Sequence, residues 1–137
     1  MVMRLVKQYS VFLPNEPGTL RQFTEIFSRA GVNIIAISQD VRYDSAIIRI
    51  AVEEDNDEIS HAITKSGFTS VKADAVSIDA PDRVGFLSEL SKLFGDAGIN
   101  LSSIYGSTGS GSHARMIIVP NDIPKAIDLL KRSKILE

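Results

Sequence analysis

Two loops of one kind, 67 residues apart, carry the side chains best suited to chemistry in this sequence. Asn15 and Gly18 lie in the first loop, and Asp82 and Gly85 take the same places in the second. A helical pattern begins at each loop, so its glycine is expected beside a helix N-terminus, where free N–H groups and the dipole attract a carboxylate. Asn15 and Asp82 could bind the ammonium group of the same ligand, or could cap a turn. A shared turn explains the repeated glycine equally well, so both interpretations stay open.

The loops are part of a longer repeat. Five residues that follow the first loop recur 67 positions later: Phe27, Ala30, Gly31, Asn33 and Ile37 correspond to Phe94, Ala97, Gly98, Asn100 and Ile104. Self-similarity at a fixed period indicates one structural unit used twice. Each residue of one copy can therefore be compared with its counterpart in the other.

Each copy has the pattern of an α+β unit. In the first copy, period-two alternation over residues 7–13 predicts a half-buried strand, and apolar spacing over 20–30 predicts a helix. Two strands follow at 34–43 and 46–52, then a short helix and a closing strand. This order is that of the ferredoxin-like βαββαβ motif. We therefore predict an α+β fold of two such units in tandem, with helices packed on one face of an antiparallel sheet.

The repeat also predicts the domain boundaries. We expect one unit over residues 1–70 and a second over residues 71–137. The second unit has almost no residues left for its last strand, and residues 2–6 lie one period before the strand that closes the first unit. We infer that residues 2–13 and 69–80 form two long strands shared by both units. Such strands would fuse the units and remove two exposed sheet edges.

Composition excludes several classes of function. Of the 137 residues, 44% are hydrophobic and 23% are charged, which is typical of a globular protein. The formal net charge of -2 gives no electrostatic drive towards nucleic acid. The sequence has no cysteine, so disulfides and thiolate metal sites are excluded. Because neither a membrane-spanning apolar run nor a secretory signal is visible, we expect a cytoplasmic protein that does not bind a membrane.

We predict neither a metal site nor a cofactor. His61 and His113 have no partner at the spacing of metal ligands. The acidic run at residues 53–58 is interpreted as capping the helix that follows, with a divalent-cation site as the alternative. The stretch Gly106–Ser112 lacks the Lys-Ser/Thr ending of a phosphate-binding loop and is predicted to be a hairpin loop.

The sequence around both loops resembles the signature of ACT domains, the small-molecule-sensing modules of amino-acid metabolism. The resemblance rests on Asn15-Glu-Pro-Gly-Thr-Leu20 with Ala30-Gly31-Val-Asn33-Ile34, and on Asp82-Arg-Val-Gly-Phe-Leu87 with Ala97-Gly98-Ile-Asn100-Leu101. It covers nearly the whole chain, as two tandem copies with no enzyme domain attached. Copy two has Val84 where the family usually has proline, so the two loops need not bind equally.

The resemblance implies a stand-alone regulatory or sensor protein that is not an enzyme, binds an amino acid and forms a homodimer. In the family, the ligand typically binds where two units meet, between the strand-to-helix loop of one unit and its neighbour. The candidate ligand-binding residues carried over from the family are Asn15, Glu16, Pro17, Gly18, Thr19, Asn33, Ile34, Asp82, Arg83, Val84, Gly85, Phe86, Asn100 and Leu101. No catalytic residue is carried over.

Two other functions remain open at this point. A ligand-free interaction module could use sheet faces or edges to pair with a metabolic enzyme. A small enzyme of the acylphosphatase type would need an arginine close to an asparagine, for which Arg83 and Asn100 are the candidates, although the loop lacks a glycine-rich phosphate cradle. RNA binding by a fold of this strand order is set aside, because the central strands lack exposed aromatic residues for base stacking.

Overall fold

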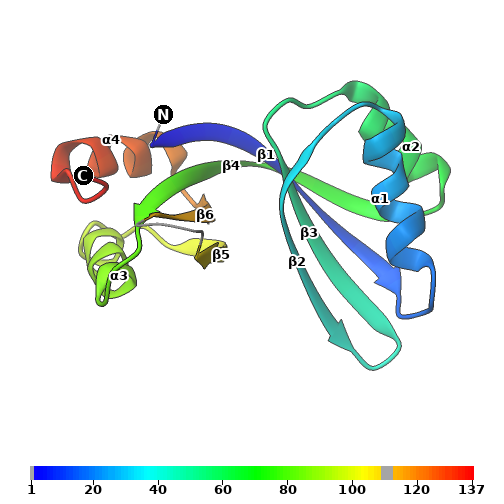
Figure 1. Ribbon diagram of the computed structural model, residues 1–137, viewed down its shortest axis with the longest axis horizontal. Helices are drawn as coiled ribbons and strands as arrows, with labels where there is room; N and C mark the ends of the chain where they lie inside the picture. Colours follow the sequence, from blue (N-terminus) through cyan, green and yellow to red (C-terminus); the bar gives the residue numbers. More distant parts are fainter. Residues whose placement is uncertain (1, 109–112) are drawn as a thin grey trace. The chain divides into compact units, whose positions relative to one another are not determined.

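The computed structural model describes residues 2–108 and 113–137. Within these ranges the chain forms six strands and four helices, and it divides into two compact units (Figure 1). We call residues 6–73 the N-terminal unit, and residues 1–5 together with 74–137 the C-terminal unit. The predicted α+β class with two ferredoxin-like units is confirmed.

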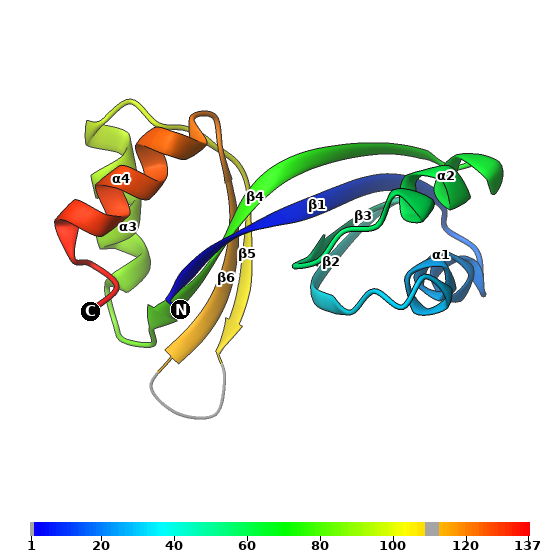
Figure 2. The ribbon, with the colours of Figure 1, turned by 90° about the horizontal axis from the view of Figure 1, so that it is seen from above.

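The N-terminal unit has two helices on one face of its strands (Figure 2). Strand order in this unit is β2-β3-β1-β4, and β3 pairs antiparallel with both β1 and β2. Its elements are β1 (Met3–Pro14), α1 (Thr19–Arg29), β2 (Ile34–Arg42), β3 (Ser45–Val52), α2 (Asp57–Lys65) and the first part of β4 (Thr69–Pro81).

The C-terminal unit repeats this plan. Strand order here is β1-β4-β6-β5, and β6 pairs antiparallel with both β4 and β5. Both helices again lie on the same face of the strands (Figure 2). The elements that follow β4 are α3 (Phe86–Asp96), β5 (Leu101–Thr108), β6 (His113–Pro120) and α4 (Ile123–Ser133).

Strands β1 and β4 each contribute residues to both units. Residues 1–5 belong to the C-terminal unit. There the Asp79 N–H donates a hydrogen bond of 2.7 Å to the carbonyl oxygen of Val2, and Met3 packs against the apolar core. The predicted sharing of long strands is confirmed, whereas the boundary between residues 70 and 71 stays a prediction.

The core of the N-terminal unit follows directly from the sequence pattern. Tyr9, Val11 and Leu13 alternate along β1 and are buried, as period-two alternation requires. They pack against Phe23 and Phe27 on one face of α1, whose rings meet edge to face with centroids 5.4 Å apart. Burial of this face fixes α1 over the sheet and thereby positions the loop that precedes it.

The core of the C-terminal unit uses equivalent positions. Val76 and Ile78 of β4 are fully buried, and so is Leu90 of α3. Phe94, the counterpart of Phe27, completes the same helix face. The helix α3 is thereby held over the sheet with its N-terminus at the second loop.

The hairpins of the two units differ in length by one residue. Gln39 pairs with Ile48 in the N-terminal unit, whereas Gly106, 67 positions after Gln39, pairs with Met116. Strand β5 continues to Thr108, past the start of the hairpin loop predicted at Gly106–Ser112. Of the hairpin loop predicted at Gly106–Ser112, residues 109–112 lie outside the described part of the chain.

No helix among the described residues combines the length and apolar character needed to cross a lipid bilayer.

Candidate functional site

The two repeated loops place a glycine at the N-terminus of a helix, as predicted. Gly18 precedes α1 with φ of 88°, and Gly85 precedes α3 with φ of 89°, a left-handed conformation that favours glycine. Neither helix receives a side-chain cap. By contrast, α2 and α4 are capped by the side chains of Asn56 and Asp122. The N–H groups of the first turn at both loops are therefore free of the usual side-chain acceptor.

In the N-terminal unit, Asn15 joins its loop to the β2–β3 turn. Its side-chain amide donates to the carbonyl oxygen of Tyr43 at 3.2 Å, and its backbone N–H donates to that of Asp44 at 2.8 Å. The turn role that the sequence left open for Asn15 is thus present in the structure. Its side-chain amide donor is used by the protein itself.

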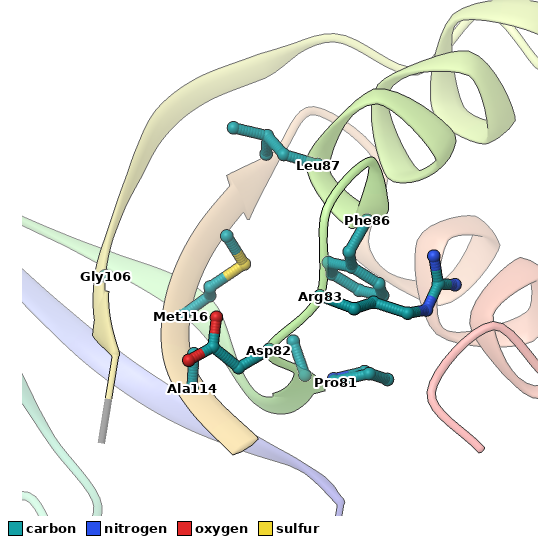
Figure 3. A pocket seen from close by; sticks show the side chains of 9 residues that line it. Pro81, Asp82, Arg83, Phe86, Leu87, Gly106, Ala114 and Met116 are labelled. Carbon is teal, nitrogen blue, oxygen red and sulfur yellow. The ribbon is translucent and has the colours of Figure 1, made fainter. Parts of the chain in front are cut away.

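In the C-terminal unit, the equivalent residue Asp82 has a different environment. A carboxylate cannot donate a hydrogen bond as the Asn15 amide does. No described residue forms a hydrogen bond or ion pair with the Asp82 side chain. Figure 3 shows this carboxylate projecting to the same side of the loop as the Met116 side chain. Asp82 therefore offers an unused acceptor for a cationic group.

A cavity of about 230 Å³ lies at this second loop. Apart from Asp82 and Arg83, its lining is apolar, and the lining residues come from the end of β4, the start of α3, and the paired strands β5 and β6. The apolar lining residues are Ala80, Pro81, Phe86, Leu87, Gly106, Ala114 and Met116. The volume suits one small metabolite and lies below the usual range of pockets for drug-sized ligands.

Arg83 is held by an ion pair beside the cavity. Its guanidinium donates two hydrogen bonds to Glu89, at 3.0 and 2.6 Å, and lies over the Phe86 ring. These hydrogen bonds raise the pKa of Arg83 and lower the pKa of the Glu89 carboxyl. In Figure 3 the guanidinium extends away from the Asp82 carboxylate. Of the two charged residues that line the cavity, Arg83 is thus paired with another described residue and Asp82 is not.

The remaining loop candidates are mostly at the surface. Glu16, Pro17 and Gly18 are exposed, and Thr19 is half-buried at the start of α1. In the second loop Val84 is fully exposed, whereas the Phe86 side chain is buried in the core. Phe86 therefore forms one wall of the cavity and also supports the fold.

Four candidates lie at the far end of their helix from the loop. Asn33 and Ile34 follow α1, and Asn100 and Leu101 follow α3, whereas the loops precede these helices. The Asn100 backbone N–H donates to the Asn121 side chain at 3.1 Å. An 11-residue helix such as α3 is about 16 Å long. Within one unit, the loop candidates and these four residues thus form two separate groups.

This separation bears on the acylphosphatase alternative. Arg83 precedes α3 and Asn100 follows it, so the two residues stand at opposite ends of that helix. The Arg83 guanidinium is also engaged with Glu89. The arginine–asparagine pair that the alternative required is therefore not formed within the C-terminal unit.

Sequence reasoning missed most of the residues that form the apolar part of the cavity, although Phe86 was a candidate. Ala80, Leu87, Ala114 and Met116 were not among the candidates, and Gly106 was interpreted only as the start of a loop. The available signal was a difference between the copies at two of these positions, where Ala80 and Gly106 replace Leu13 and Gln39.

The described residues contain no group of three or more histidine, cysteine, aspartate or glutamate side chains arranged to hold a metal ion.

Comparison with known proteins identifies the family. The model of the ACT domain matches residues 10–65 and again residues 75–132. The chain belongs to the ACT domain family. Each match covers one of the two loops and the helix that follows it. No curated protein shows a significant sequence match.

Several solved structures share the architecture of this tandem ACT chain. Protein BT0572 from Bacteroides thetaiotaomicron is 27% identical, with a TM-score of 0.82 over 98% of this chain and 92% of its own. The ligand-free regulatory subunit of aspartate kinase from Thermus thermophilus is 16% identical, with a TM-score of 0.71 over 95% of both chains. The corresponding subunit from Thermus flavus is 16% identical, with a TM-score of 0.64 over 100% of this chain and 98% of its own.

Proposed function

We propose that this protein is a regulatory sensor that binds a free amino acid and has no catalytic activity of its own. The observation that carries the proposal is the cavity at the second loop, whose otherwise apolar lining includes the unpaired Asp82 carboxylate and the start of α3, a helix without a side-chain cap. Membership of the ACT family and the likeness to regulatory subunits of aspartate kinase support it.

The chemistry of the loop fits a zwitterion. Asp82 supplies the negative charge for the ligand ammonium group. Helical geometry leaves the N–H groups of Leu87 and Ser88 without partners inside α3, and these groups suit the ligand carboxylate. Gly85 itself has no side chain, and the place where its Cβ would be is open, with nothing within 4 Å. The cavity would receive the ligand side chain.

Binding would act by shifting a conformational equilibrium. A ligand can favour one arrangement of a regulatory protein only by its differential affinity for that arrangement. In this proposal the ligand links the loop before α3 to strands β5 and β6, which both line the cavity. The ligand would therefore stabilise the C-terminal unit in the form that has this cavity. A neighbouring ACT unit could complete the site, with Asn33, Ile34, Asn100 and Leu101 as its candidate contacts.

The test is a thermal-shift screen of the common amino acids against the full chain, followed by calorimetric titration of any that stabilise it. Saturating ligand raises the unfolding temperature in proportion to the logarithm of its concentration over Kd. We expect stabilisation at millimolar concentration, and at least a tenfold loss of affinity in Asp82→Asn. The control is Asp44→Asn, which removes the same charge from an exposed turn outside the cavity. No stabilisation by any amino acid would contradict the proposal.

We further propose that the protein forms a homodimer in the cytoplasm. Several apolar side chains of the N-terminal unit are exposed: Ile37 and Val41 on β2, Tyr43 in the turn after β2, Leu20 on α1 and Phe12 on β1. A second copy would cover such side chains and remove them from water. Light scattering coupled to size exclusion measures the mass of the particle, and a mass of one chain would contradict the dimer.

The same exposed side chains favour one alternative function, a ligand-free module that pairs with a metabolic enzyme. This alternative predicts a flat amino-acid screen together with stable binding to such an enzyme. The proposed sensor predicts a positive screen, so one experiment separates the two.

A further inference from the structure

We propose that the cavity at the second loop selects an amino acid with an aliphatic side chain of the size of valine, leucine or isoleucine, and that each chain binds one such ligand. This inference rests on the proposed sensor function and adds the class of ligand and the number of sites. It follows from three features of the cavity: its small residues, its difference from the first copy, and the place of its charges.

The first feature is a group of small residues where three strands meet. Ala80 of β4 pairs with Ala114 of β6, and Gly106 of β5 pairs with Met116 of β6. A Cβ atom added to Gly106 would lie 2.6 Å from the Arg115 carbonyl oxygen, so the tight approach of the two strands excludes a side chain at this position. Ala80, Gly106 and Ala114 therefore leave space on the sheet surface below the start of α3. Met116 is the one long side chain beside them on these strands.

The second feature is that the first copy has larger side chains at two of the equivalent positions. Leu13 is the counterpart of Ala80, and it is 2% exposed within the apolar core. Gln39 stands in place of Gly106, since both pair with the equivalent residue of the next strand. The ligand side chain in the C-terminal unit would thus take the place that the Leu13 side chain has in the N-terminal unit. The Leu13 side chain therefore indicates the size and apolar character of a ligand side chain that would fit.

The third feature is the position of the charges. Asp82 and Arg83 are the charged residues that line the cavity, both belong to the loop, and Arg83 is already paired with Glu89. With Asp82 taken by the ligand ammonium group, a charged ligand side chain placed against Ala80 and Met116 would lose water without gaining a partner. An aliphatic side chain gains from the same transfer. The volume of about 230 Å³ has to hold the ligand main chain as well, which disfavours the largest aromatic side chains.

The experiment is calorimetric titration of the full chain with alanine, valine, leucine, isoleucine, phenylalanine, lysine and aspartate. Each methylene in an apolar pocket changes affinity on the order of tenfold or more. We expect leucine, isoleucine or valine to bind at least tenfold more tightly than alanine and than lysine or aspartate, with one ligand for each chain.

Two variants locate the site. Ala114→Leu places a leucine side chain in the cavity from a half-buried position and should weaken binding at least tenfold. Met116→Ala enlarges the cavity and should shift the preference towards phenylalanine. The control is Ala62→Leu, the same change at a half-buried position of α2 in the other unit, and it should leave the affinity unchanged. Circular dichroism confirms that each variant is folded, and the Met116→Ala shift serves as the readout if Ala114→Leu does not fold.

The outcomes separate this inference from the proposed function. The proposed aliphatic selectivity of this cavity is wrong in any of three cases: lysine or aspartate binds as tightly as leucine, two ligands bind each chain, or Ala114→Leu leaves the affinity unchanged. In these cases the proposal of amino-acid sensing still stands. If no amino acid binds, the proposed function itself is wrong.

Discussion

The Tyr9 hydroxyl donates a hydrogen bond of 2.5 Å to Asp55, a residue 46 positions later in the chain. Lys72 donates to the second oxygen of the same carboxylate at 2.8 Å, and its ammonium lies over the Tyr9 ring. Burial alone would raise the pKa of the Asp55 carboxyl, but the hydrogen bonds from Lys72 and Tyr9 outweigh burial and hold this pKa below its usual value. Burial and the bond to Asp55 raise the pKa of Tyr9, and the bond to Asp55 also raises the pKa of Lys72.

This cluster predicts a pH-dependent contribution to stability. Because the folded-state pKa of Asp55 is lowered, its contribution is present above the unfolded pKa of about 4 and is lost as pH falls through the folded value. Because the pKa values of Tyr9 and Lys72 are raised, their contributions are present below about pH 10 and are lost as pH rises further. We expect Asp55→Asn to lower the free energy of unfolding by about 1–2 kcal/mol at pH 7, and by less at pH 3.

Urea denaturation at both pH values measures this difference. Glu54→Gln is the control, since Glu54 is exposed, and it should change the free energy of unfolding by less than about 0.5 kcal/mol. An Asp55→Asn effect that is the same at pH 3 and pH 7 would show that the carboxylate charge is not the cause.

Two of the glycines in and beside α3, Gly85 and Gly95, should respond in opposite ways to the same substitution. Gly85 has a φ of 89°, so Gly85→Ala forces an alanine into the left-handed region and should destabilise the protein by about 1–2 kcal/mol. Gly95 lies inside α3, and an added Cβ there meets nothing within 4 Å. Gly95→Ala should therefore stabilise by about 0.5–1 kcal/mol, because alanine favours the helix. Chemical denaturation of both variants measures the signs, and equal signs would contradict the backbone argument.

The packing of Met3 predicts that the N-terminal residues stabilise the C-terminal unit. Its half-buried side chain packs against the core of that unit, so Met3→Ala should cost about 1–2 kcal/mol. Val2 is 50% exposed, and Val2→Ala should cost less than about 0.5 kcal/mol. Hydrogen exchange should show the loss of protection in residues 74–137 of the Met3→Ala variant. A loss confined to residues 6–73 would contradict the assignment.

Asn15 and Asp82, the first residues of the two loops, should contribute unequally to stability. Asn15→Ala removes the hydrogen bond to the Tyr43 carbonyl oxygen and should cost about 0.5–1 kcal/mol. Asp82→Ala removes no hydrogen bond or ion pair with a described residue, so it should change stability by less than about 0.5 kcal/mol. Thermal unfolding without ligand compares the two variants. A larger loss for Asp82→Ala would mean that its carboxylate supports the fold and is not reserved for a ligand.

Much of the fold could be predicted because local patterns and the repeat agree. The alternation of Tyr9, Val11 and Leu13 and the helical spacing of Phe23 and Phe27 each depend on residues close in sequence. The structure buries all five. The same patterns in the second copy gave independent support, since a unit used twice must satisfy them twice.

The cavity could not be predicted because it depends on register. Ala114 and Met116 reach it only through their pairing with β4 and β5, and the offset between the copies changes from 67 residues before the hairpin loop to 68 after it. The bond from Asn15 to Tyr43 spans 28 positions and was equally hidden. The spacing of apolar residues predicted that the candidate loop lies beside a helix N-terminus. It could not predict which side chains lie opposite the loop, because these depend on the pairing of distant strands.

The sharing of β1 and β4 limits how this protein can be divided. A fragment of residues 74–137 would lack Met3 and the carbonyl of Val2, which accepts the Asp79 N–H. No single cut in the chain releases a unit with all of its own residues, because residues 1–5 belong to the unit formed by residues 74–137. Recombinant expression of the C-terminal unit alone would therefore need residues 1–5 grafted onto residues 74–137, and exchange of either unit between related proteins would need two crossover points.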